Sequence, residues 1–177
     1  MGVIACNLGF ATPEVRSLKL ASTMHDVGKI GVPNSILLKR GPLSADERAE
    51  MEKHAERGRR ILEGSTSDVV RLAAEIAESH HERMDGAGYP RGLRGEAIPL
   101  SGRVLAVADV FDALVSERPY KTAWPLERAR AFVANQAGLH FDPRCVDAFL
   151  SGWDEVEAHR YESIASECLP AECFAQL

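Results

Sequence analysis

The chain has 177 residues, of which 45% are hydrophobic and 27% charged, and this composition fits one globular domain with a sizeable core. Its formal net charge of −5 provides no basic field for a phosphate backbone, so we expect no binding to a nucleic-acid polymer. No apolar run approaches the ~20 residues of a membrane span, and the four cysteines lack paired zinc spacing, so we expect no membrane association and a cytoplasmic protein with reduced thiols.

The first predicted elements lead to a histidine and an aspartate. Residues 2–8 have the pattern of the last turns of a helix, and a second helix is predicted to begin at Thr12 and Pro13. The apolar stripe of this second helix extends to His25. We therefore expect His25 to point inward on that helix, with Asp26 beside it.

A loop and two further helices follow. Residues 32–42 are predicted to form a loop with an apolar plug at residues 36–38, and Ser44 with Glu47 forms a capping box for a third helix. A fourth helix, capped near Ser67, leads to two adjacent histidines. One face of the third helix is predicted to carry Met51, His54, Gly58, Ile61 and Leu62.

The stretch His80–Pro90, with the sequence HHERMDGAGYP, is the centre of the predicted site. Apolar residues at helical spacing before it point His80 inward, and His81 can reach the same cavity where the glycines let the backbone turn. Two imidazoles there suit a borderline metal ion, whereas the alternative is one buried histidine bonded to a carbonyl beside an exposed neighbour. Glu82 and Asp85 either orient the histidines or are turn residues.

The residues after Pro99 predict three more helices and no strand. The first covers residues 101–116 and carries Asp109 and Asp112 in an otherwise apolar pattern. Burying a bare carboxylate is costly, so both aspartates are expected to face a cation or a dense set of hydrogen bonds. The other two helices are predicted at residues 125–135 and 143–153. The sequence therefore predicts an all-α fold.

These positions together predict a metal centre. Mixed imidazole and carboxylate ligands favour iron, manganese, zinc or similar divalent ions over calcium or magnesium. Asp26 can bridge two ions, and two ions clamp the attacking and leaving oxygens of a phosphoryl displacement. We therefore predict hydrolysis of a phosphate ester by water, with Lys29 neutralising charge in the transition state. The candidate ligands are His25, His54, His80 and Asp109 on four predicted helices, with Asp26 and His81 adjoining.

The same residues carry a family resemblance. The sequence HDVGK at residues 25–29 is similar to the signature of the HD superfamily of phosphohydrolases, and the loop ending in Gly88-Tyr89-Pro90 resembles the HD-GYP class of cyclic di-GMP phosphodiesterases. The resemblance implies a compact helical bundle of the HD-domain type, with a catalytic domain at residues 1–153 and a polar extension at residues 154–177. The likeness continues through residues 92–93, 98–100, 108–114, 118–121 and 141–143.

The resemblance also implies roles for individual residues. Lys29 and Asp26 would be catalytic, and Tyr89, Arg118 and Lys121 would contact the dinucleotide. Two or more divalent transition-metal ions are implied, with iron or manganese favoured and zinc or others open. The implied metal ligands are His25, Asp26, His54, His80, His81 and Asp109.

One departure from the family pattern concerns the start of the chain. Family members usually carry a further histidine, and in some a glutamate, upstream of the position of residue 1. The resemblance therefore implies that the catalytic domain lacks the start of its first helix. It also implies a longer parent protein with an upstream receiver or sensor domain.

Three functions remain open from the sequence. The first is hydrolysis of cyclic di-GMP to linear dinucleotide and/or GMP in bacterial second-messenger signalling. The second is a general HD nucleotide phosphohydrolase, against which the GYP loop and residues 118–121 argue. The third is a catalytically impaired relay module that docks other signalling proteins through the GYP loop. Retention of the ligands from His25 onward opposes the third function, and the absence of the upstream histidine supports it.

Overall fold

The computed structural model describes residues 1–117 and 122–167, and this part of the chain is helical. The only β pairing in the described residues is an isolated bridge between Ala137 and Phe141. The all-α prediction is therefore confirmed. The helices are α1 (Gly2–Asn7), α2 (Thr12–Ser22), η1 (Val27–Gly31), α3 (Asn34–Leu37), α4 (Ala45–Glu52), α5 (His54–Leu62), α6 (Asp68–Ser79), η2 (Gly95–Ala97), α7 (Leu100–Val115), α8 (Leu126–Asn135), α9 (Pro143–Ser151) and α10 (Trp153–Glu167).

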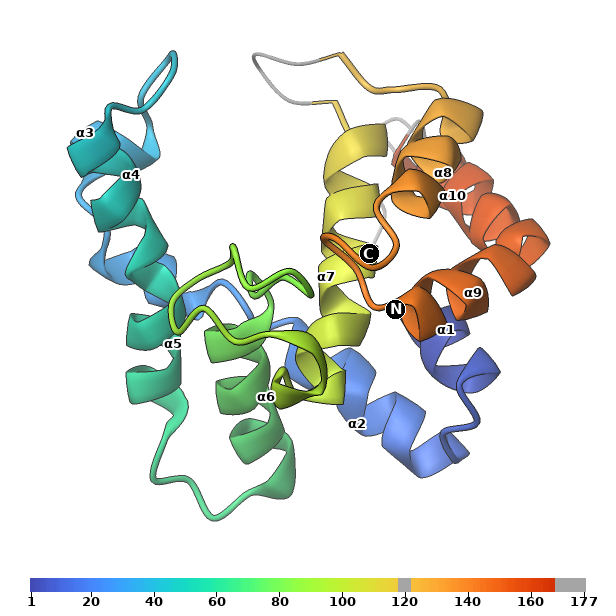
Figure 1. Cartoon of the computed structure of the whole chain (residues 1–177), viewed down its shortest axis with the longest axis horizontal. Helices are drawn as coiled ribbons and strands as arrows, with labels where there is room; N and C mark the ends of the chain where they lie inside the picture. Colours follow the sequence, from blue (N-terminus) through green and yellow to red (C-terminus); the bar gives the residue numbers. More distant parts are fainter. Residues whose placement is uncertain (118–121, 168–177) are drawn as a thin grey trace, which may run out of the picture.

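Helix α7 lies in the middle of the bundle, with α3 to α6 on one side and α8 to α10 on the other (Figure 1). Its residues enter two apolar cores, because Leu105 packs with α2 and α6 whereas Phe111 packs with the C-terminal helices. The rings of Phe149 and Trp153 lie 5.0 and 5.8 Å from the Phe111 ring. This shared helix fixes the two halves of the bundle relative to each other.

The second helix ends earlier than predicted. It stops at Ser22, so His25 and Asp26 lie in the turn before η1 and not on the helix itself. The hydroxyls of Ser22 and Thr23 donate hydrogen bonds to the carbonyl oxygens of Lys19 and Leu20 in the last turn of the helix. The predicted helical position of His25 was therefore wrong, although its side chain still points into the bundle.

Two apolar predictions in the next segment were also wrong. Residues 36–38 form no plug: most of them belong to α3, and Leu37 and Leu38 are 39% and 71% exposed. The predicted third helix is divided into α4 and α5 at Lys53. Ile61 is 50% exposed, because it lies at the edge of the α5 face that buries His54, Gly58 and Leu62. The capping box of Ser44 and Glu47 is confirmed.

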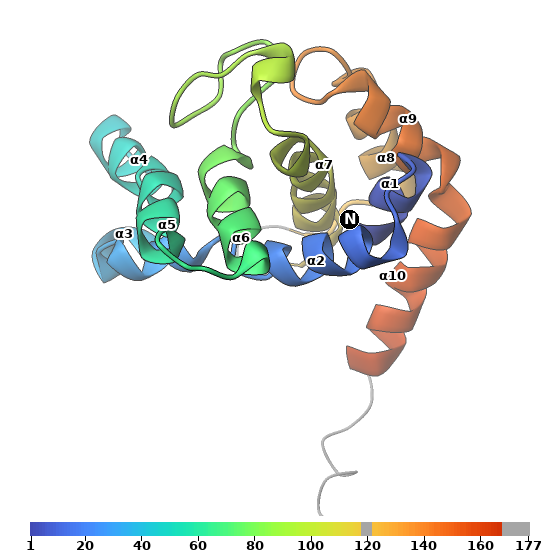
Figure 2. The same cartoon turned by 90° about the horizontal axis from the view of Figure 1, so that it is seen from below.

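The chain after the GYP loop differs from the prediction at two places. Asp112 is exposed on α7 and not buried as predicted, so its carboxylate does not need a cation or a dense set of hydrogen bonds to offset burial. The last predicted helix ends at Ser151, and Trp153 begins α10, which extends below the body of the bundle (Figure 2). Within the described residues, no helix has the length and apolar character to cross a membrane.

Candidate metal centre

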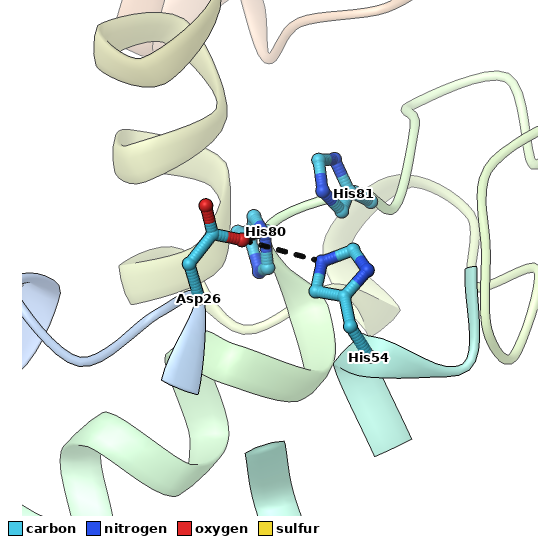
Figure 3. Close-up of side chains that lie close together, drawn as sticks. All are labelled: Asp26, His54, His80 and His81. Carbon is cyan, nitrogen blue, oxygen red and sulfur yellow. Dashed lines mark ion pairs between the residues drawn. The ribbon is translucent and has the colours of Figure 1, made fainter. Parts of the chain in front are cut away.

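Three segments distant in sequence bring four of the candidate ligands together. The turn before η1 supplies Asp26, the start of α5 supplies His54, and the end of α6 supplies His80 and His81. Figure 3 shows these four side chains pointing toward one another. One ligand atom from each of them lies within 4.8 Å of every other.

A glycine allows the turn that carries Asp26 to lie against α5. A Cβ atom on Gly28 would be 2.0 Å from the carbonyl oxygen of His54 and 2.4 Å from the backbone nitrogen of Gly58. No other side chain fits between these backbones, so η1 packs directly on α5. This close packing brings Asp26 to the start of α5, where His54 is 1% exposed.

Hydrogen bonds to the main chain fix the orientation of three imidazole rings. The Nδ1 atoms of His25, His54 and His80 lie 2.8, 2.7 and 3.0 Å from carbonyl oxygens three residues earlier in the chain. A carbonyl oxygen only accepts, so each Nδ1 carries the proton. In the neutral rings of His54 and His80 this leaves a free lone pair on Nε2. The sequence allowed His80 to be either a metal ligand or a buried histidine bonded to a carbonyl. In the structure its ring does both: Nδ1 bonds a carbonyl oxygen and Nε2 faces the cluster.

Those lone pairs converge on one carboxylate oxygen. The Oδ1 atom of Asp26 lies 3.5 Å from Nε2 of His54 and 3.9 Å from Nε2 of His80. All three atoms are shielded from solvent and have no hydrogen-bond partner in the described part of the chain. Buried polar atoms without partners are costly and rare. Two imidazole nitrogens and a carboxylate oxygen in this arrangement fit a divalent transition-metal ion.

The second oxygen of Asp26 faces a different set of groups. Its Oδ2 atom lies 3.4 Å from Nε2 of His25 and 2.5 Å from Nζ of Lys29. The same His25 nitrogen lies 3.7 Å from Oδ1 of Asp109 on α7. The two carboxylate oxygens of Asp26 therefore point to two adjacent positions, which is the arrangement that a bridging ligand requires.

The electrostatic environment keeps Asp26 ionised. Burial acts to raise the pKa of its carboxyl group, but the hydrogen bonds with His25 and Lys29 outweigh burial and hold the pKa far below its ordinary value. The hydrogen bond with Asp26 raises the pKa of His25 in turn, against the effect of burial. An anionic carboxylate is thus present at the centre of the cluster at neutral pH.

The remaining histidines are kept neutral. Burial lowers the pKa of His54, and burial together with the neighbouring histidines lowers the pKa of His80 to about 4 and that of His81 to about 2. The His81 ring lies 3.9 Å from that of His80 and 5.0 Å from that of His54. Neutral imidazole is the form that binds a metal ion, so this part of the site needs no deprotonation at neutral pH.

Tyr89 lies at the edge of the cluster. Its ring is 4.7 Å from the His81 ring and 6.2 Å from the His54 ring. Burial raises the pKa of the Tyr89 phenol, so the hydroxyl stays protonated and can donate a hydrogen bond. The other two predicted substrate contacts, Arg118 and Lys121, lie outside the described residues.

The acids after the histidine pair bind backbone groups of the loop that follows them. The carboxylate of Glu82 accepts hydrogen bonds from the backbone N–H groups of Arg91 and Leu93, and that of Asp85 accepts one from the N–H of Ala87. Helix carbonyls and not acids orient the histidines at Nδ1. The sequence left this choice open.

A sequence model described as the HD domain matches residues 1–145. The chain belongs to the HD-domain family. This match confirms the family predicted from the HDVGK sequence at residues 25–29.

Several relatives of this HD-domain chain have names that state a substrate. The response regulator RpfG of Xanthomonas campestris, named a cyclic di-GMP phosphodiesterase, is 51% identical over 156 residues, which are 88% of this chain and 41% of the relative. A Vibrio cholerae protein named 3'3'-cGAMP-specific phosphodiesterase 2 is 49% identical, over 86% of this chain and 29% of its own length. A Thermotoga maritima cyclic di-GMP phosphodiesterase is 48% identical, over 88% of this chain and 42% of its own length. The chain thus spans less than half the length of these relatives.

Solved structures support the fold. The V-cGAP3 structure, titled as a cyclic GMP-AMP phosphodiesterase of V. cholerae, matches 92% of this chain and 43% of its own with a TM-score of 0.63 at 24% identity. The HDGYP protein Bd1817 of Bdellovibrio bacteriovorus matches 82% of this chain and 46% of its own with a TM-score of 0.64 at 20% identity. At these identities the likeness concerns the HD-type helical fold.

Proposed function

We propose that this chain carries the catalytic centre of a metal-dependent phosphodiesterase that hydrolyses cyclic di-GMP to linear dinucleotide and/or GMP. One observation carries the proposal: buried ligand atoms of Asp26, His54 and His80 converge without partners in the described residues, and Tyr89 lies at the edge of the same cluster. A metal position beside an aromatic hydrogen-bond donor suits a phosphodiester with attached bases.

The ligands would be the six residues predicted from the sequence. His54, His80 and His81 offer neutral imidazoles, Asp26 offers one oxygen to each of two positions, and His25 and Asp109 lie on the far side of Asp26. Two divalent ions, with iron or manganese favoured, would supply Lewis-acid stabilisation of the negative charge that builds up on the phosphate.

The protein's own groups would bind and orient the substrate. Lys29 holds a cationic Nζ atom against Asp26, where it can move to a phosphate oxygen as negative charge develops. The protonated Tyr89 hydroxyl can donate to the substrate from the edge of the site. Arg118 and Lys121 are proposed to grip the phosphates, since arginine offers bidentate geometry to a phosphodiester.

Cyclic di-GMP is chosen over a general nucleotide because of the GYP loop beside the histidines and the names of the relatives. The two kinds of relative have similar identities, 51% and 48% for proteins named after cyclic di-GMP and 49% for one named after 3'3'-cGAMP. Cyclic GMP-AMP is therefore the second candidate substrate. A relay module without turnover is opposed by the complete set of ligands from His25 onward.

The wider context also belongs to the proposal. We place the catalytic domain at residues 1–153 and a C-terminal extension at residues 154–177, within a cytoplasmic signalling protein that has an upstream receiver or sensor domain. Contacts with other signalling proteins through the GYP loop are part of the same proposal.

The test is product chromatography with anaerobically purified full-length protein, combined with elemental analysis. Cyclic di-GMP and 3'3'-cGAMP are supplied separately, and an Asp26→Ala variant is the control. We expect metal-dependent loss of cyclic di-GMP with linear dinucleotide or GMP as product. Faster turnover of 3'3'-cGAMP would reassign the substrate, and a metal-loaded protein that cleaves neither compound would reject the phosphodiesterase assignment.

A further inference from the structure

Glu82, the residue directly after the histidine pair, is a buried acid with an unusual set of partners. Its side chain is 2% exposed, and its two oxygens accept hydrogen bonds from the backbone N–H groups of Arg91 and Leu93, both at 2.8 Å. No ion pair to Glu82 occurs in the described part of the structure. A buried carboxylate is tolerated only when its oxygens are satisfied, and here the far side of the GYP loop supplies both donors.

The part of the loop that precedes Pro90 also contacts the residues next to Glu82. The backbone N–H of Tyr89 donates to the carbonyl oxygen of His81 at 3.2 Å. A Cβ atom on Gly88 would be 2.5 Å from both the His81 carbonyl oxygen and the Arg83 nitrogen. The loop therefore folds back onto residues 81–83. Tyr89 makes the backbone contact with His81, and Arg91 and Leu93, shortly after it, make the two contacts with Glu82.

This arrangement determines where the Tyr89 ring can lie. The ring packs 4.7 Å from the His81 ring, and the hydrogen bonds of Glu82 fix the backbone just after it, at residues 91 and 93. Both hydrogen bonds of the Glu82 carboxylate go to the loop backbone, and neither goes to a ligand atom of the cluster. The Glu82 carboxylate is therefore connected to the loop and not directly to the ligand atoms.

We propose that Glu82 is a positioning residue that holds Tyr89 over the histidine cluster, in reach of a bound dinucleotide. The part of this proposal that concerns the dinucleotide rests on the proposed function. The rest concerns the loop alone and is independent of any activity.

The first residues of the loop are bound to a different part of the chain. The N–H groups of Met84 and Asp85 donate to the carbonyl oxygens of His140 and Leu139, in the turn before α9. These bonds fix the outer part of the loop on the C-terminal half of the bundle. They leave the segment from Tyr89 to Leu93 to be held by His81 and Glu82.

The first test measures amide hydrogen exchange in the full-length protein. The N–H groups of Arg91 and Leu93 are expected to exchange slowly in the parent. In Glu82→Gln one acceptor oxygen is replaced by an NH2 donor, so one of the two N–H groups is expected to exchange about tenfold faster, the factor for losing one hydrogen bond to a charged group. Amides of α6 should not change. The matched control is Glu75→Gln, because Glu75 bonds Ser101 and does not touch the loop. Exchange in the parent at the rate of an unprotected peptide would reject the proposal without any variant.

The second test separates a positioning role from a structural one. Glu82→Gln is expected to raise KM for cyclic di-GMP about tenfold with metal content intact. In a Tyr89→Ala background the same change is expected to have no further effect on KM. An equal additional effect in that background would overturn action through Tyr89. A parent protein that cleaves no cyclic dinucleotide would reject the proposed function, while the exchange experiment would still decide the role of Glu82.

Discussion

The Oδ1 atom of Asp26 lies 3.5 Å from the Nε2 atom of His54, and neither atom has a hydrogen-bond partner within the described residues. The opposite oxygen of the same carboxylate faces His25 and Lys29. Asp26 therefore has one oxygen beside His54 and His80 and the other beside His25, whereas His54 faces only the first of these two positions. This difference leads to a prediction about metal content.

The Asp26→Ala variant should lose more metal than the His54→Ala variant. If Asp26 bridges two ions, its removal takes one ligand from each, while His54 serves only one ion. Elemental analysis of both variants after anaerobic purification is the measurement. Asp26→Ala is expected to retain less than half as much metal as His54→Ala, and equal retention would reject the bridging role.

The close packing of η1 on α5 predicts that alanine at Gly28 lowers the stability of the protein more than alanine at Gly31. Gly28→Ala should destabilise the protein by on the order of 1 to 3 kcal/mol or more, because the added methyl group meets the backbone of α5, which cannot move aside. Gly31→Ala is the matched control, since its methyl group would meet only the flexible side chain of Arg57. Thermal unfolding of the metal-free proteins should give a clearly lower Tm for Gly28→Ala. Similar Tm values would contradict the close packing of η1 on α5.

The extent of the sequence-based prediction can be explained through the same elements. Helical periodicity identified the inward direction of His54 and His80, because His54 is the first residue of α5 and His80 directly follows α6. It failed for His25, because α2 ends at Ser22, three residues earlier. It also could not place Glu82, whose partners are backbone groups 9 and 11 residues away. Contacts made by a loop with its own backbone leave no period in the sequence.

Tyr89 should affect the substrate more than the metal. Tyr89→Ala removes a ring at the edge of the cluster that supplies no candidate ligand atom, so it should raise KM or lower kcat by about tenfold while metal content stays at the parent level. His80→Ala is the comparison, since it removes a buried ligand atom. Both variants are measured by elemental analysis and steady-state kinetics. Metal loss in Tyr89→Ala equal to that in His80→Ala would make the ring a structural support of the cluster.

A histidine outside the cluster predicts how stability depends on pH. Burial, with the nearby Arg83 cation second, lowers the pKa of His140 to about 4, below the ordinary value of 6.5 expected in the unfolded chain. Between these values the unfolded state binds more protons than the folded state, so the free energy of unfolding decreases as the pH falls from 6.5 toward 4. We expect this group to account for a loss of about 1 kcal/mol, after a discount for solvent screening at a partly exposed ring.

Replacing the ring should remove that part of the pH dependence. His140→Gln is expected to have a flatter profile of unfolding free energy than the parent between pH 6.5 and 4, measured by urea denaturation of the metal-free protein so that protons do not compete with metal ions. His159→Gln, which replaces an exposed histidine on α10, is the control for the substitution itself. Because the stacked Phe141 ring at 4.2 Å loses its partner in His140→Gln, the variant is expected to be less stable at neutral pH. A uniform loss with an unchanged slope would assign His140 to packing alone and remove it from the acid response.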